Sequence, residues 1–193
     1  MTREEWLNTL AESLRPLFDA VGATVPDLVR VSVGWPSRSG LSLKKRTIGQ
    51  CWSPKCSADH ATEIFISPFL GDGGQVAETL LHEMIHAAVG TECGHKGAFV
   101  ETAKKLGFTA PWKSTPATPD LKGRLQLLLP GDYPHGQLEP LMGGIKKQTT
   151  RLVKVSCPGC GYTLRTTRKW IDERGTPICP CNSKPMEAEA AQV

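Results

Sequence analysis

The chain has 193 residues with a net charge of +4; hydrophobic residues make up 39% and charged residues 22%. This composition excludes a disordered chain and predicts one ordinary globular domain with a small appendage. No apolar stretch is long enough to span a bilayer, and the acidic, amphipathic segment 1–6 lacks the form of a signal peptide. We therefore expect a cytoplasmic protein with no membrane partner.

Hydrophobic periodicity predicts an α+β body in the first three quarters of the chain. Helices are expected at about residues 3–20, 75–89, 96–106 and 120–129, and strands at 29–33, 47–52 and 63–67. Residues 131–144 hold many turn formers and should lead out of this body. The expected domains are thus 1–145 and 146–186, with a loose tail at 187–193.

Positive charge is concentrated in the second of these domains. Residues 146–184 contain nine Lys or Arg and two Asp or Glu, whereas residues 1–145 contain fourteen and fifteen. A basic module beside a near-neutral body is typical of a nucleic-acid-binding attachment. A small solvated metal module would carry the same charge, so charge alone leaves both interpretations open.

Two histidines four residues apart lie on one face of the helix expected at 75–89. His82 and His86 can therefore hold one metal ion, and imidazole nitrogens suit zinc. Glu83 follows the first histidine directly, which in this pattern places its carboxylate beside the position left open to water, as a general base. The alternative is a buried helix with two incidental histidines, because His-Glu-x-x-His alone is a weak pattern.

A catalytic zinc needs a third protein ligand. Glu92 stands where the metzincin pattern requires histidine, which excludes that class. His95 follows Gly90 and Gly94, where the chain can turn back toward the metal. His95 is therefore the favoured ligand, and Glu101 on the next helix is the alternative.

Four cysteines near the C-terminus form a second metal pattern. Cys157-Pro-Gly-Cys160 has the form of a zinc knuckle, and Cys179-Pro-Cys181 supplies another pair. Four thiolates make a closed tetrahedral site, so this zinc would be structural. So small a module would depend on its metal to fold, and such clustered thiolates suit a reducing compartment.

The residues between the two cysteine pairs divide into core and surface. Leu164, Trp170 and Ile178 are expected to fill a minimal core. Arg165 and Arg168 are among the basic side chains left to face a phosphate backbone. Trp170 is favoured for this core, and base stacking by Tyr162 or Trp170 is the alternative.

Several segments resemble the SprT-like family of zinc metallopeptidases, to which Spartan belongs. The matching segments are 81–87, 94–99, 49–51 and 64–68, within a likeness that covers about residues 45–108 and continues as architecture alone at 155–183. The chain departs from the family pattern at Lys96, which separates His95 from Gly97, and in its Cys-x-Cys pair. The resemblance implies a zincin-like peptidase domain followed by a zinc ribbon, and in relatives such as Spartan a protease acting on DNA-bound proteins.

These patterns together predict an α+β zincin-like metallopeptidase with a small mixed sheet at 1–145 and a basic zinc ribbon at 146–186. Glu83 is the predicted catalytic base, with a catalytic zinc on His82, His86 and His95 and a structural zinc on Cys157, Cys160, Cys179 and Cys181. The expected partners are a protein or peptide substrate and, through the ribbon, DNA. The alternatives are a non-catalytic nucleic-acid-binding regulator and another zinc hydrolase such as an amidase.

Overall fold

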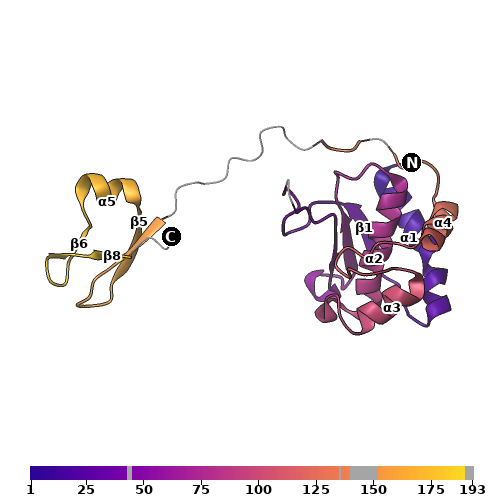
Figure 1. The fold of residues 1–193 in the computed structure, drawn as a ribbon, viewed down its shortest axis with the longest axis horizontal. Coiled ribbons are helices and arrows are strands. Elements are labelled where there is room, and N and C mark those ends of the chain that lie inside the picture. Colours follow the sequence, from indigo (N-terminus) through magenta and orange to yellow (C-terminus); the bar gives the residue numbers. More distant parts are fainter. Residues whose placement is uncertain (43–44, 135, 140–151, 190–193) are drawn as a thin grey trace. The chain divides into compact units, whose positions relative to one another are not determined.

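The computed structural model describes residues 1–42, 45–134, 136–139 and 152–189 (Figure 1). The chain divides into two compact units, unit 1 (Met1–Met142) and unit 2 (Gly143–Val193). The domain boundary predicted between residues 145 and 146 lies outside the described residues. In the described part of the chain, no helix is both long and apolar enough to cross a membrane.

Unit 1 has the mixed α+β composition that the sequence predicts. Its elements are α1 (Arg3–Val21), β1 (Val29–Val33), β2 (Gly49–Trp52), β3 (Thr62–Ile66), α2 (Gly73–Val89), α3 (Ala98–Leu106) and α4 (Pro119–Leu128), with short 3-10 turns at Pro54–Cys56 and Thr91–Cys93. All seven predicted helices and strands of this unit are confirmed, with boundaries that differ by two residues at most.

The sheet of unit 1 has three strands in the order β1-β3-β2 and is mixed, because β1 runs parallel to β3 and β2 runs antiparallel to it. Side chains alternate between the two faces of a strand. Val31, Ile64 and Ile66 are buried against the helices, which gather on one side of the sheet in Figure 1. This packing gives α2 a rigid support.

The outer edge of β1 is closed by a side chain of α1. Asn8 Nδ2 donates a hydrogen bond of 2.8 Å to the carbonyl of Val31, and the amide of Val31 donates one of 3.1 Å to Asn8 Oδ1. The asparagine amide thus takes the place that a neighbouring strand would occupy at this residue.

The outer edge of β2 is the other end of the sheet. Because the amide of Ser67 donates to the carbonyl of Ile48 at 2.8 Å, the alternation of an antiparallel pair directs the backbone groups of Ile48 and Gln50 toward β3. The backbone groups of Gly49 and Cys51 consequently point away from the sheet. These backbone groups form the outer edge of β2, which borders the candidate site.

Helix α2 is held in place by a cap and by complete burial of its apolar face. Asp72 Oδ1 accepts a hydrogen bond of 2.7 Å from the amide of Gln75, which fixes the helix start. On two neighbouring turns of this helix, four side chains have no exposed surface: Leu80, Leu81, Met84 and Ile85. Burial of such a side chain stabilises the fold by about 1.5–3 kcal/mol. His82, Glu83 and His86 therefore project from a well-fixed helix.

Unit 2 is built around its cysteines. Its elements are β4 (Leu152–Ser156), β5 (Thr163–Thr167), α5 (Arg168–Arg174), β6 (Ile178–Cys179), β7 (Lys184–Pro185) and β8 (Glu187–Ala188). Among its described residues, Val155, Cys157, Cys179 and Met186 form the buried hydrophobic cluster, and Leu164, Ile171 and Ala188 pack against them. So small an apolar core gives little stabilisation of its own.

Three predictions about unit 2 need correction. Trp170 and Ile178 are exposed, at 51% and 64%, rather than in the core. Ile171 is the α5 residue turned inward, and Ile178 faces outward because its neighbour Cys179 on β6 faces the core. The tail predicted from residue 187 begins as strand β8, which pairs with β4 and is tied by an ion pair of 2.8 Å between Lys154 and Glu189.

Candidate metal centres

The three histidines predicted as metal ligands converge in unit 1. His95 Nε2 lies 3.1 Å from His82 Nε2 and 3.3 Å from His86 Nε2. His82 and His86 are 9% and 8% exposed, and His95 is half-buried. One nitrogen atom of each ring thus faces a common point.

Two glycines bring His95 to the helix. Gly94 has φ 53° and ψ −128°, and Gly97 has φ 51° and ψ −122°. These combinations lie where only glycine is comfortable. The chain can therefore leave α2 at Gly90, reverse around His95 and begin α3 within a few residues.

A buried aromatic ring supports all three imidazoles. Phe99 is fully buried, and its ring centroid lies 5.0 Å from that of His82 and 4.9 Å from that of His95. It stacks on His86 at 4.5 Å with an interplanar angle of 29°. Because these rings share one packed support, their orientations are restricted.

The remaining ring nitrogens have different surroundings. His82 Nδ1 lies 2.6 Å from the hydroxyl oxygen of Thr115. His86 Nδ1 is buried and has no hydrogen-bond partner among the described residues. Of the two helix histidines, His82 is therefore the one with a polar partner behind it.

The spacing of the histidine nitrogens fits a zinc ion. Two nitrogens each about 2.0–2.1 Å from a tetrahedral zinc lie about 3.3–3.4 Å apart. The observed separations of 3.1 and 3.3 Å agree with that value. Burial also lowers the pKa of His82 to about 3 and that of His86 to about 4, which keeps both rings neutral, as metal ligands must be.

Glu83 lies beside this group, pressed against the edge of the sheet. Its side chain is 6% exposed, and burial raises the pKa of its carboxyl to about 8, against an opposing hydrogen bond from the backbone amide of Cys51. A Cβ atom at Gly49 would lie 2.5 Å from Glu83 Oε1 and 2.9 Å from its Cγ. The absence of a side chain at Gly49 therefore makes the space in which this carboxylate sits.

A cleft of about 1040 Å³ opens over the histidines and Glu83. Strand β2 lines it through Gly49, Gln50 and Cys51, and residues 113–115 line it beyond His95. The candidate metal ligands, a buried carboxylate and a sheet edge thus share one open cavity of substrate size.

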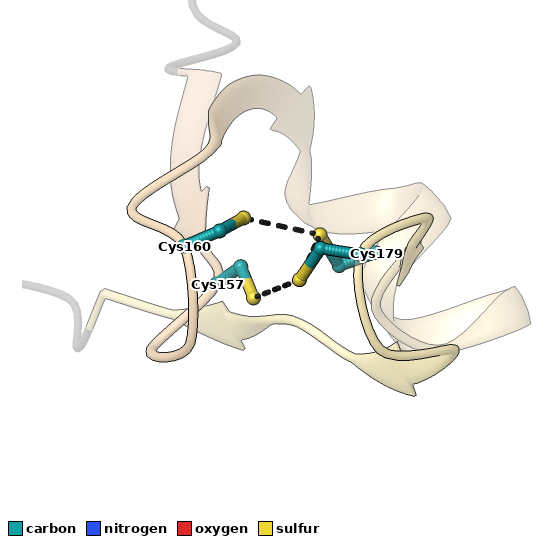
Figure 2. Close-up of side chains that lie close together, drawn as sticks. Cys157, Cys160 and Cys179 are labelled. Atoms are coloured by element: carbon teal, nitrogen blue, oxygen red, sulfur yellow. Dashed lines mark hydrogen bonds between the residues drawn. The ribbon is translucent and has the colours of Figure 1, made fainter.

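The four predicted cysteines also converge, in unit 2. The sulfur of Cys157 lies 3.6 Å from that of Cys181, and Cys160 lies 3.6 Å from Cys179. Cys179 and Cys181 are 3.5 Å apart. Figure 2 shows the labelled side chains of Cys157, Cys160 and Cys179 turned toward one another, and all four thiols are free rather than in disulfides.

This cluster fits a tetrahedral thiolate site. Sulfur atoms about 2.3 Å from one zinc ion lie about 3.8 Å apart, close to the observed 3.5–3.6 Å. Hydrogen bonds from the backbone amides of Cys160 and Gly159 lower the pKa of Cys157 to about 6. Amides directed at the first sulfur are the arrangement expected of a knuckle, and they favour the thiolate form.

Both groups have the composition and spacing of sites that could hold a metal ion. Glu101, the alternative ligand, is exposed on α3 and is not part of the histidine group. Sequence reasoning missed the contributions of Phe99, Thr115 and Gly49. The glycine stands in the segment that carries the family resemblance, whereas no pattern singles out Thr115.

Comparisons of the chain with protein-family models, with curated proteins and with solved structures find no match.

Proposed function

We propose that the chain is a zinc-dependent endopeptidase with a zincin-like catalytic domain of the SprT-like kind. The observation that carries the proposal is the convergence of three imidazole nitrogens beside the buried carboxyl group of Glu83. Together with the resemblance of segments 81–87 and 94–99 to that family, this geometry favours a peptidase over another zinc hydrolase.

The proposed reaction uses Glu83 as a proton carrier. A zinc ion held by His82, His86 and His95 would supply Lewis acidity, polarising the scissile carbonyl and lowering the pKa of water. Glu83 takes a proton from the attacking water as the water oxygen bonds to the carbonyl carbon. It then delivers that proton to the nitrogen as the carbon–nitrogen bond breaks, so that an acid and an amine leave. The space at Gly49 accommodates the carboxyl group beside the histidines, where both transfers can occur.

In this proposal, the substrate binds as an additional strand of the sheet, next to β2. The backbone groups of Gly49 and Cys51 face the cleft, and Asn8 closes the opposite edge at Val31. An extended peptide pairing with β2 would be recognised mainly through its main chain. Cleavage is consequently expected to depend little on substrate sequence and to require an unfolded segment.

Unit 2 would direct the enzyme to nucleic acid. Tyr162 and Trp170 are about half exposed, and Lys169 Nζ lies 5.3 Å from the Trp170 ring centroid. Arg165 and Arg168 are exposed nearby in sequence. Exposed aromatic rings among basic side chains suit base stacking and phosphate contact, so proteins associated with DNA are the proposed substrates.

Replacing Trp170 tests this docking role. Trp170→Ala in the full chain is expected to weaken binding of a single-stranded oligonucleotide about 5- to 150-fold, because stacking on an aromatic side chain contributes about 1–3 kcal/mol per base. Fluorescence anisotropy at several salt concentrations measures the affinity for the oligonucleotide. Leu127→Ala, an 87% exposed residue of α4, is the matched control and should bind as the wild type does. Absence of any salt-dependent affinity in the wild type would contradict the role.

Metal stoichiometry tests the catalytic site. Wild-type protein purified under reducing conditions is expected to contain two zinc ions and to hydrolyse an unfolded polypeptide until a chelator removes the metal. His95→Ala should contain about one zinc ion and lose hydrolysis, because the two remaining histidines cannot retain the metal. Glu101 is the alternative third ligand that lies outside the histidine group, so Glu101→Ala should keep both zinc ions. One zinc ion in wild type and both variants would instead favour the regulator without a catalytic metal.

A further inference from the structure

We infer that Thr115 is a positioning residue for the histidine site, holding the Nδ1 proton of His82 so that Nε2 presents its lone pair to the metal. The hydroxyl oxygen of Thr115 lies 2.6 Å from His82 Nδ1, and its side chain is 3% exposed. The two residues are 33 positions apart, so this contact is tertiary. The inference rests on the proposed function, since it concerns the same metal site.

The loop holds Thr115 in a conformation unfavourable for its residue type. Thr115 has φ 35°, which a β-branched residue rarely adopts. Three other non-glycine residues have positive φ in the described part of the chain, and Ser39, His60 and Ser183 are all exposed. Thr115 alone among these four is buried. A strained backbone conformation at a buried residue persists only when the surrounding structure holds that residue in place.

Backbone hydrogen bonds fasten the loop on both sides of Thr115. The amides of Ser114 and Thr115 both donate to the carbonyl of Pro111, at 3.0 and 2.8 Å. The amide of Thr109 donates to the carbonyl of Pro116 at 2.9 Å. The hydroxyl is therefore presented by a fixed loop rather than by a mobile one.

The direction of the hydrogen bond follows from the other ring nitrogen. His82 Nε2 lies 3.1 Å from His95 Nε2, at the point where three ring nitrogens meet. A proton on His82 Nε2 would occupy the space that a metal needs. The tautomer with its proton on Nδ1 leaves that space free, and it requires an acceptor, which the hydroxyl of Thr115 supplies. His86 Nδ1 has no hydrogen-bond partner among the described residues, so of the two helix histidines only His82 is held in this way.

Zinc affinity of the full chain tests the inference without reference to catalysis. Thr115→Val keeps the size and β-branching but lacks the hydroxyl, and Thr115→Ser keeps the hydroxyl. Removing an outer hydrogen-bond partner of a metal ligand typically costs 10- to 100-fold in metal affinity. Competition with a chromophoric chelator should therefore show the histidine site weakened about 10- to 100-fold in Thr115→Val and within about threefold of wild type in Thr115→Ser.

The four-cysteine site serves as an internal control in the same protein. Cobalt substitution separates the two sites, because only thiolate ligands give a sulfur-to-metal charge-transfer band, and that band should be unchanged in both variants. Thermal unfolding of the metal-free variants detects general damage; if Thr115→Val does not fold, Thr115→Ala takes its place.

The outcomes distinguish this inference from the proposed function. Two zinc ions in the wild type with undiminished affinity in the variant without the hydroxyl would overturn the role of Thr115 alone. Equal weakening by Thr115→Ser would overturn it too, because shape rather than the hydroxyl would then matter. A wild type with a single, thiolate-bound ion would overturn the proposed function, and in that case the role of Thr115 falls with it.

Discussion

Loss of the zinc ion proposed at the four-cysteine group is expected to unfold unit 2 and leave unit 1 folded. Cys160→Ala removes one of the four converging sulfurs, whereas the apolar core of this unit consists of little more than Val155 and Met186. Structural zinc supplies an apparent binding free energy of about 10–16 kcal/mol in small zinc modules, and the folding free energy is lost with it. Hydrogen exchange should then show the amides of β4 and β5 unprotected, while those of α2 stay protected.

A second cysteine gives the matched control. Cys56 is exposed in unit 1 and belongs to neither metal group, so Cys56→Ala should preserve protection in both units. Protected β4 and β5 amides in the zinc-free Cys160→Ala protein would show that unit 2 folds without its metal.

Glu83→Gln is expected to lower peptide hydrolysis about 10²- to 10⁴-fold while the protein keeps both zinc ions. Glutamine fills the same space but cannot take up and return a proton, and general acid–base catalysis typically contributes a factor of this size. The loss should appear in kcat rather than in KM, because Glu83 acts on the reacting water. The assay is cleavage of an unfolded, fluorescently labelled polypeptide, with zinc determined on the same sample.

Two further variants sharpen that test. Glu92→Gln changes an exposed glutamate between His86 and His95 and should hydrolyse as the wild type does. Gly49→Ala should lower kcat with zinc content unchanged, because its new methyl group would meet Glu83 Oε1 at 2.5 Å and displace the carboxylate. Full activity in Glu83→Gln would contradict the proposed general base, whatever the zinc content.

Much of unit 1 could be predicted from the sequence, because its elements follow simple periodicities. Strand β1 matches the alternation of valines at 29, 31 and 33, and α2 matches the apolar face of segment 75–89. Helix α2 begins two residues earlier than expected because Asp72 caps it, so that Gly73 and Gly74 lie in its first turn. His82 and His86 were predictable from their spacing on one helix face and the cysteines from their grouping in two pairs, whereas His95 was favoured because Gly90 and Gly94 let the chain turn back.

Other features depend on contacts that no local pattern reveals. Thr115 lies in a loop containing prolines, and only the folded chain brings its hydroxyl to His82. Trp170 was predicted in the core, yet it is exposed, and Ile171 is the residue of the short helix α5 that packs inward. In a unit with so few buried residues, the position of the cysteines decides which side chains face inward.

The hydrogen bonds between Asn8 and Val31 have a consequence for the proposed binding of unfolded chains at β2. Strand addition is also the route by which unfolded chains aggregate, and a sheet with two open edges can be built into a growing stack. In unit 1, a strand that pairs with β2 joins a sheet whose opposite edge strand is β1. The backbone groups of Val31 on that edge are already hydrogen-bonded to Asn8. If strand addition at β2 takes place as proposed, a stack of strands that pairs with this edge should end at unit 1, so the protein is expected to terminate such a stack rather than seed it.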